Sequence, residues 1–275
     1  MKKVLAIVGF ALIGSSFGLD EYLPVEKSKL EVDLAYGFMS ATGGYDSSGK
    51  KQDLPDGFSQ SQNAIPLQLK YGIMPGLDVE AFWAFGIIGI KSDAVGPIPA
   101  TDKSFSGFTQ PDIAVKYAMM DIGAGVFLDY TLPFATGDFA DPDQPPMALA
   151  FGAVYTKLFM PKFNLTGLLQ YKLNFEDKGK FKDGNVFSIY AKPEFRFNEF
   201  GGAYLGLRYD MAGEGAFDGT SVKDSDASLF TLLPGWNATW LPNVATEVNV
   251  PLTLMGKNNT ASWGINANVY YTVAL

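Results

Sequence analysis

The sequence predicts an all-β fold: a closed transmembrane antiparallel up-and-down β-barrel of about 12 strands, preceded by a signal peptide. Three observations predict it. Apolar and polar residues alternate along most of the chain, long polar connections follow every second strand, and the chain ends on an amphipathic stretch, Ala261–Leu275. Because successive side chains of a β-strand point to opposite faces, each alternating stretch has one apolar and one polar face.

The first residues have the features of a secretory signal peptide. Two lysines precede an apolar run, Val4–Gly14, which is too short to span a bilayer, and Ser16 and Gly18 are small residues that suit signal peptidase. We therefore expect a signal peptide over residues 1–18 and a single barrel domain over residues 19–275. An N-terminal membrane anchor or a buried first strand is the alternative interpretation.

The alternating pattern continues through the remaining chain. In its first stretch Leu30 and Val32 lie on one face, whereas Glu31 and Asp33 lie on the other. The faces of residues 147–159 are the hardest to tell apart because of four residues, Ala148, Ala150, Gly152 and Val154. No stretch of comparable length has the period of a helix. The predicted strands are, in chain order, 30–38, 65–73, 77–85, 113–119, 122–132, 147–159, 165–173, 187–197, 203–211, 230–240, 244–254 and 261–275.

The connections between these strands alternate in length. Tight turns follow the even strands, at residues 74–76, 120–121, 160–162, 198–201 and 241–243. Polar loops follow the odd strands, at residues 40–62, 91–107, 135–146, 176–185, 212–226 and, more briefly, 257–260. Short periplasmic turns that alternate with longer outer loops are typical of a membrane barrel. A soluble β-sandwich, the alternative, would not sort its loops in this way.

Aromatic residues form two bands on the predicted outer face, as they do at the two interfaces of a bilayer. The band near the turns holds Tyr71, Tyr117, Phe197, Trp240 and Tyr271. The band near the loops holds Phe38, Trp83, Tyr130, Tyr171, Tyr209 and Trp263.

Composition limits the chemistry that the chain can carry. The sequence has no cysteine and no histidine, which removes disulfides, thiolate metal sites and the commonest general base. Its 21 basic and 29 acidic residues give a net charge of −8, which argues against nucleic acid as a partner. The inward pair Asp78 and Glu80 has no shaped, dry pocket around it, and the loop acids Asp138, Asp141 and Asp143 lack a defined ligand loop. We therefore expect no catalytic residue, cofactor or metal.

The terminal stretch Ala261–Leu275 resembles the C-terminal assembly signal of bacterial outer-membrane barrels. It departs in its last residue, because that signal usually ends in Phe or Trp. The resemblance implies a bacterial outer-membrane location, with the barrel assembly machinery, outer-membrane lipid and lipopolysaccharide as partners. A closed barrel also requires this strand to pair antiparallel with Leu30–Phe38, which would turn Tyr270 toward the lumen.

Polar residues on the inward face are the candidates for function. One interpretation is that they pair into a network that fills the lumen without a specific ligand. Another is that they line a solute path whose acidic excess favours cations or neutral polar solutes. The lumen-lining candidates are Glu31, Asp33, Lys70, Asp78, Glu80, Asp112, Lys116, Asp129, Lys172, Lys192, Glu194, Arg196, Arg208, Asp210, Glu247, Asn266 and Asn268.

Five prolines lie within or beside predicted strands, where each removes a possible ladder hydrogen bond. Bulges or strand ends are the simplest explanation. A kinked wall with a lateral opening, through which an apolar solute leaves into the membrane, is the alternative. The five are Pro66, Pro111, Pro193, Pro234 and Pro251.

Three stretches of the chain resemble segments of one protein family, the outer-membrane transporters named for the meta-cleavage pathway of phenol degradation. The stretches are Leu132–Asp138, Pro111–Tyr117 and Val250–Asn258. The first departs from the family's Leu-Pro-Thr-Gly-Asp segment by an insertion, Phe134-Ala135. The resemblance implies passage of small, aromatic or apolar molecules and carries over no catalytic residue. The hypotheses are therefore a transport channel, a structural or surface-binding barrel with a plugged lumen and, disfavoured by the missing histidine, an enzyme.

Overall fold

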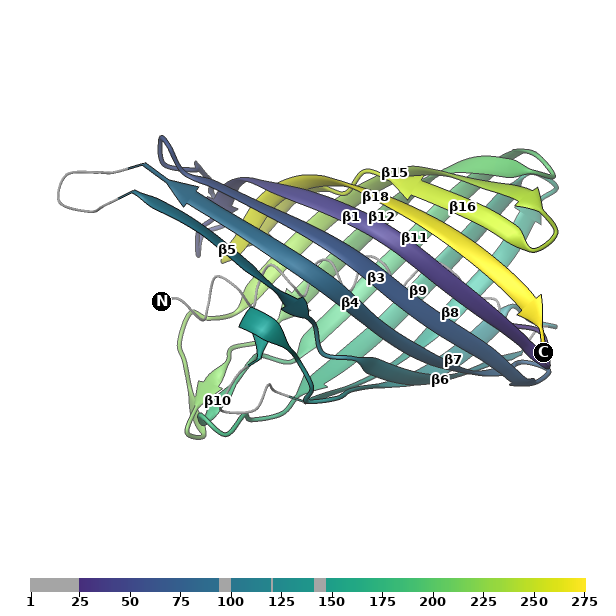
Figure 1. Ribbon diagram of the computed structural model, residues 1–275, viewed down its shortest axis with the longest axis horizontal. Coiled ribbons are helices and arrows are strands. Elements are labelled where there is room, and N and C mark those ends of the chain that lie inside the picture. Colours follow the sequence, from purple (N-terminus) through teal and green to yellow (C-terminus); the bar gives the residue numbers. More distant parts are fainter. Residues whose placement is uncertain (1–24, 94–99, 120, 141–146) are drawn as a thin grey trace.

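A long antiparallel sheet curves until its first and last strands meet (Figure 1). This computed structural model describes residues 25–93, 100–119, 121–140 and 147–275. Apart from one short 3-10 helix, η1 (Gly137–Phe139), the regular elements in these ranges are all strands. None of the helical structure there is long and apolar enough to cross a membrane. The signal peptide expected from the sequence lies outside these ranges.

Twelve strands make up the wall in the part of the chain that the structure describes, as predicted. Two of them are interrupted: β5 leads into β6 alongside β4, and β16 leads into β17 between β15 and β18. The wall consists of β1 (Lys29–Tyr45), β3 (Ser59–Met74), β4 (Leu77–Ser92), β5 (Thr101–Phe108), β6 (Asp112–Met119), β7 (Ala124–Thr131), β8 (Ala148–Met160), β9 (Phe163–Asn174), β11 (Val186–Asn198), β12 (Gly201–Ala212), β15 (Ala227–Leu241), β16 (Val244–Asn249), β17 (Leu252–Lys257) and β18 (Asn259–Ala274).

Pairing of β18 with β1 closes the wall, which confirms the closure predicted from the sequence. The ladder runs from Lys29, opposite Ala274, to Tyr45, opposite Asn259, with one bulge. Asp33 therefore lies opposite Tyr270. Because pairing consumes the free edges of both terminal strands, no backbone donor or acceptor row is left to face the bilayer there.

The two ends of the barrel differ as predicted: tight turns join the strands at one end, the turn end, and longer connections join them at the other, the loop end. Several predicted loops nevertheless contain strands. The connection 91–107 contains most of β5, and the connection 257–260 shrinks to a turn at Asn258. Polar hairpins at the loop end need no apolar face, so hydropathy does not mark them as strands. The others are β2 (Lys51–Asp53), β10 (Phe181–Lys182), β13 (Ala216–Phe217) and β14 (Thr220–Ser221).

The wall has an apolar outer face and a largely polar inner face. Outward Leu34 and Leu128 are 52% and 51% exposed, whereas inward Asp78 and Glu247 are 0% and 3% exposed. The first part of β8, whose faces the sequence left open, alternates in the same way: Phe151 and Tyr155 are exposed, whereas Ala148, Ala150 and Val154 are buried. A face of exposed apolar side chains on a closed barrel is the surface that lipid covers.

Pro111 and Pro251 lie at strand interruptions, as the simpler interpretation predicts, whereas Pro66, Pro193 and Pro234 lie inside paired strands and not at bulges or strand ends. The strand register continues past Pro66, Pro193 and Pro234, which counts against a lateral opening at these positions. Pro111 lies in the interruption between β5 and β6, where the pairing with β4 shifts by a residue. Pro251 separates β16 from β17, so the predicted strand 244–254 is divided, although its register is kept. Without an amide hydrogen, proline cannot continue the ladder there.

Candidate functional site

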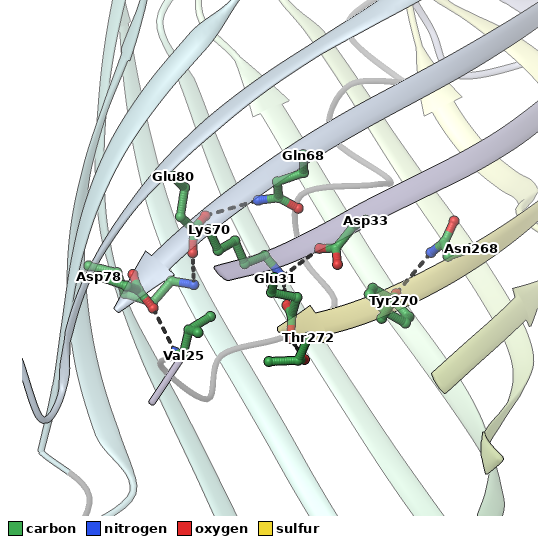
Figure 2. Close-up of polar contacts among 11 residues, drawn as sticks. Val25, Glu31, Asp33, Gln68, Lys70, Asp78, Glu80, Asn268, Tyr270 and Thr272 are labelled. Atoms are coloured by element: carbon green, nitrogen blue, oxygen red, sulfur yellow. Dashed lines mark hydrogen bonds and ion pairs between the residues drawn. The ribbon is translucent and has the colours of Figure 1, made fainter. Parts of the chain in front are cut away.

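Charged side chains meet on the inner wall near the turn end, across β1, β3 and β18 (Figure 2). Lys70 Nζ lies 3.0 Å from Glu31 Oε1 and 2.8 Å from Asp33 Oδ2. Thr272 Oγ1 donates to Glu31 Oε2 at 3.3 Å. Lys70 and Glu31 are direct cross-strand partners, and the side chains of such partners point to the same face of a sheet. Both side chains therefore point inward.

The same network extends to β4 and β6. Gln68 Nε2 donates to Glu80 Oε2 at 3.0 Å, and Lys116 Nζ forms an ion pair with Glu80. All three side chains are buried. Buried charges of this kind are stable only when they are paired, so the inner wall gains fixed geometry from these contacts.

Asn268 and Tyr270 border this network on β18 (Figure 2). Asn268 Nδ2 donates to the Tyr270 hydroxyl at 3.0 Å, and Lys70 Nζ lies 5.8 Å from the centre of the Tyr270 ring. Together with Asp33 and Gln68, these residues line a small cavity in the inner wall. Closure of the barrel is what brings them together, because Asp33 and Tyr270 come from opposite ends of the chain.

A second network crosses the inner face of β11, β12, β15 and β16. Lys192 Nζ lies 2.9 Å from Glu247 Oε2, and the Tyr204 hydroxyl donates to the other oxygen of the same carboxylate. Lys192 Nζ also lies 4.1 Å from the centre of the Tyr204 ring, a cation–π distance. Tyr204 thus supports both charged partners of the pair.

Further predicted residues form local pairs. Toward the loop end, Arg208 Nε lies 2.7 Å from Asp210 Oδ2, and Ser188 Oγ donates to Asp210 Oδ1 at 2.6 Å. At the turn-end rim, Arg196 Nε lies 3.2 Å from Glu194 Oε1. The Arg196 side chain is 52% exposed, so it lies at the mouth rather than inside the barrel.

Four other predicted residues lie apart from both networks and from these local pairs. Asp112, Asp129 and Lys172 come from β6, β7 and β9, and one carboxylate oxygen of each aspartate lacks a hydrogen-bond partner within the described residues. Asn266 Nδ2 instead donates to Asn249 Oδ1 at 2.9 Å. The predicted set is therefore divided among several places on the inner wall.

An apolar cluster inside the barrel was missed by the sequence reasoning. Val154, Leu168, Tyr190 and Leu233 are buried together, and Phe127 packs against them. These residues come from β7, β8, β9, β11 and β15. Their place in the alternation, on the inward side of each strand, is the signal that could have found them. The inner wall thus contains an apolar area as well as polar ones.

Two of the stretches that resemble the transporter family lie side by side. Leu132 N donates to the Pro111 carbonyl at 2.9 Å, and Ser106 N donates to Asp138 Oδ2 at 2.8 Å. Asp138 therefore fixes the edge of β5, and the loop acids at 141 and 143 fall outside the described residues. No group of three potential metal-ligating side chains occurs in the described ranges.

Comparisons with known proteins show the fold. No family model and no curated protein matches the chain. The chain is similar to an outer membrane channel from Pseudomonas putida F1, with a TM-score of 0.76, 14% identity, and 92% of this chain and 98% of that chain covered. It is also similar to the translocator domain of the autotransporter NalP from Neisseria meningitidis, with a TM-score of 0.58, 11% identity, and coverages of 97% and 95%. The β-domain of the Bordetella autotransporter Brka follows, with a TM-score of 0.57, 10% identity, and coverages of 88% and 99%. The fold is that of an outer-membrane β-barrel.

Proposed function

We propose that this barrel is a channel that passes small solutes across the bacterial outer membrane. The observation that carries the proposal is the contrast between its faces: charged side chains line the inside of a closed wall whose outside is apolar. Such a wall gives solutes a path that the hydrocarbon core does not offer. The fold shared with the Pseudomonas putida outer membrane channel supports the proposal.

The inner wall favours small solutes with both a polar and an apolar part. Acidic side chains outnumber basic ones among the lumen-lining candidates, which favours cations and neutral polar groups over anions. The inward cluster around Leu168 and Leu233 makes part of the inner wall apolar. The resemblance to the transporter family of the phenol meta-cleavage pathway supports small aromatic molecules as the solute class.

Swelling of proteoliposomes tests the proposal. Vesicles that contain the refolded barrel should swell in an isosmotic solution of a small sugar, because the sugar and water enter through the lumen. Planar-bilayer recordings in asymmetric salt then report charge selectivity. A clear preference for anions would contradict the role assigned to the acidic inner wall.

A structural or surface-binding barrel with a plugged lumen is the second candidate. The specific observation that favours it is the complete burial and pairing of inward charges such as Lys70 and Glu247, because paired charges need no solute. This candidate predicts no swelling with any sugar and no conductance.

Catalysis is not part of the proposal. The sequence contains no histidine, and the paired inward carboxylates are held by lysines rather than presented to a reacting group. The partners that we propose are outer-membrane lipid and lipopolysaccharide around the apolar face and, during assembly, the barrel assembly machinery at Ala261–Leu275.

A further inference from the structure

The segment before the first strand folds back onto the inner wall. Val25 N donates to Asp78 Oδ2 at 3.1 Å (Figure 2). Ser28 N donates to the Gly72 carbonyl at 2.8 Å. Val25 is 6% exposed and Asp78 is fully buried. Val25–Ser28, named the strap here, therefore lies inside the mouth at the turn end.

The wall is shaped to receive the strap. Gly72 and Asp78 are cross-strand partners on β3 and β4, and both face inward. A Cβ atom at position 72 would lie 2.2 Å from the Glu26 carbonyl oxygen and 2.5 Å from that of Val25. Only glycine leaves room for this approach. Gly72 thus supplies space and a carbonyl acceptor for the strap, and Asp78 supplies a carboxylate acceptor.

The other end of the strap is fixed as well. Lys29 N donates to the Glu26 carbonyl at 3.0 Å in a turn that Ser28 completes with a φ of 61°. Leu275 N donates to the Ser28 carbonyl at 3.1 Å, which ties the strap to the end of the closing strand. The strap thus reaches from β4 to the end of β18, past the ends of β3 and β1.

We propose that the strap sets the size limit of the turn-end mouth and that Asp78 is the positioning residue that holds it. Val25 and Glu26 border the cavity at this mouth together with Glu31 and Thr272, so the strap occupies cross-section that a solute would otherwise use. A hydrogen bond to a charged acceptor is stronger than one to a neutral acceptor, which suits Asp78 to hold a backbone amide. This inference rests on the proposed channel function.

A cysteine reporter tests the position of the strap without reference to transport. The chain has no cysteine, so Val25→Cys gives a unique thiol. Its labelling by a water-soluble maleimide should be slow in the otherwise unchanged barrel. Gly72→Ala, which places Cβ against the strap, should speed labelling about tenfold, the equivalent of losing one hydrogen bond to a charged group. Gly167→Ala is the matched control, because its Cβ would lie no closer than 3.9 Å to any neighbour.

Removal of the carboxylate tests the role of Asp78. Asp78→Ala should speed labelling of the Val25→Cys thiol as Gly72→Ala does, whereas Asp78→Asn, which keeps a neutral acceptor oxygen, should speed it less. Both Gly72→Ala and Asp78→Ala should raise single-channel conductance and admit larger sugars in swelling assays. Heat-modifiable migration verifies that each variant folds.

The outcomes separate the two proposals. Unchanged labelling in Gly72→Ala and Asp78→Ala would overturn the placement of the strap. Faster labelling with unchanged conductance in a conducting barrel would overturn its role in setting the size limit. Faster labelling in a barrel that never conducts, whichever variant is used, would instead overturn the channel function.

Discussion

Lys192 and Glu247 form an ion pair of 2.9 Å although β12 and β15 lie between their strands. Three strand spacings amount to roughly 14 Å along a flat sheet, more than the two side chains would span comfortably. Curvature of the wall shortens this path, because inward side chains converge toward the barrel axis. Tyr204, on the intervening strand β12, donates to the same carboxylate. The pair is therefore a product of the closed shape.

Glu247→Gln should destabilise the barrel by about 3–5 kcal/mol, because it leaves the buried charge of Lys192 without its carboxylate partner. Unfolding in urea, followed by tryptophan fluorescence, measures the loss. The double variant Lys192→Met with Glu247→Leu should recover most of it, since it removes both charges at once. If Glu247→Gln alone were as stable as the parent, the ion pair would contribute little to stability.

An arginine on the lipid-facing side of the wall should lower the free energy of unfolding, and the loss should be larger the deeper the residue lies in the membrane. Leu34→Arg places a charge on the outer face of β1 near mid-height and should cost about 2–4 kcal/mol, whereas Ser40→Arg, on the same face nearer the loop end, should cost about 0–1 kcal/mol. Reversible unfolding from lipid vesicles gives both values. Equal costs at the two positions would contradict the membrane orientation assigned to β1.

Gly235→Ala should destabilise the second network. A Cβ atom at position 235 would lie 2.2 Å from the Tyr204 ring, so the ring must move and its hydrogen bond to Glu247 weakens. We expect a loss of about 1–3 kcal/mol, as for other overpacked positions. Gly167→Ala, whose Cβ would lie at least 3.9 Å from its neighbours, is the control in the same urea titration. Equal stability of the two variants would show that the ring adapts freely.

The turn that follows β1 should resist acid. Hydrogen bonds from the Ser48 hydroxyl, the Lys50 amide and the Gln52 side chain lower the pKa of Asp46 to about 2. Because this pKa lies below the ordinary value of 3.8, the stabilisation is fully present above that value and is lost as pH falls through about 2. Amide chemical shifts of Ser48 and Lys50 should therefore hold down to about pH 3. Asp46→Ala should shift them at every pH, and early titration in the parent would refute the assignment.

The wall was predictable because a bilayer imposes a strong pattern on sequence. Alternation assigned the faces of strands such as 30–38, and the closing pair of β1 and β18 followed from the amphipathic end of the chain. Lipid on one side and polar groups on the other demand opposite side-chain chemistry at successive positions, so the period is readable. The division at Pro251 and the small residues of β8 blurred that period locally.

The contacts were less predictable, because alternation gives the direction of a side chain but not its neighbours across the lumen. Glu31 and Lys70 are in-register partners on adjacent strands, and a correct register would have found them. Lys192 and Glu247 need the curvature of the wall as well. The first part of β5, residues 101–104, leaves no mark in hydropathy because Thr101, Asp102, Lys103 and Ser104 are polar on both faces.

The sequence by itself determined the fold class, the two faces of the wall, the order of short and long connections and the closure of Ala261–Leu275 onto the first strand. Each of these follows from local rules of side-chain direction and solvent preference. Only the tertiary structure decided which inward charges meet, and that Gly72 and Asp78 receive the strap. Such contacts depend on register and curvature, which add up over the whole wall and cannot be read from any one strand.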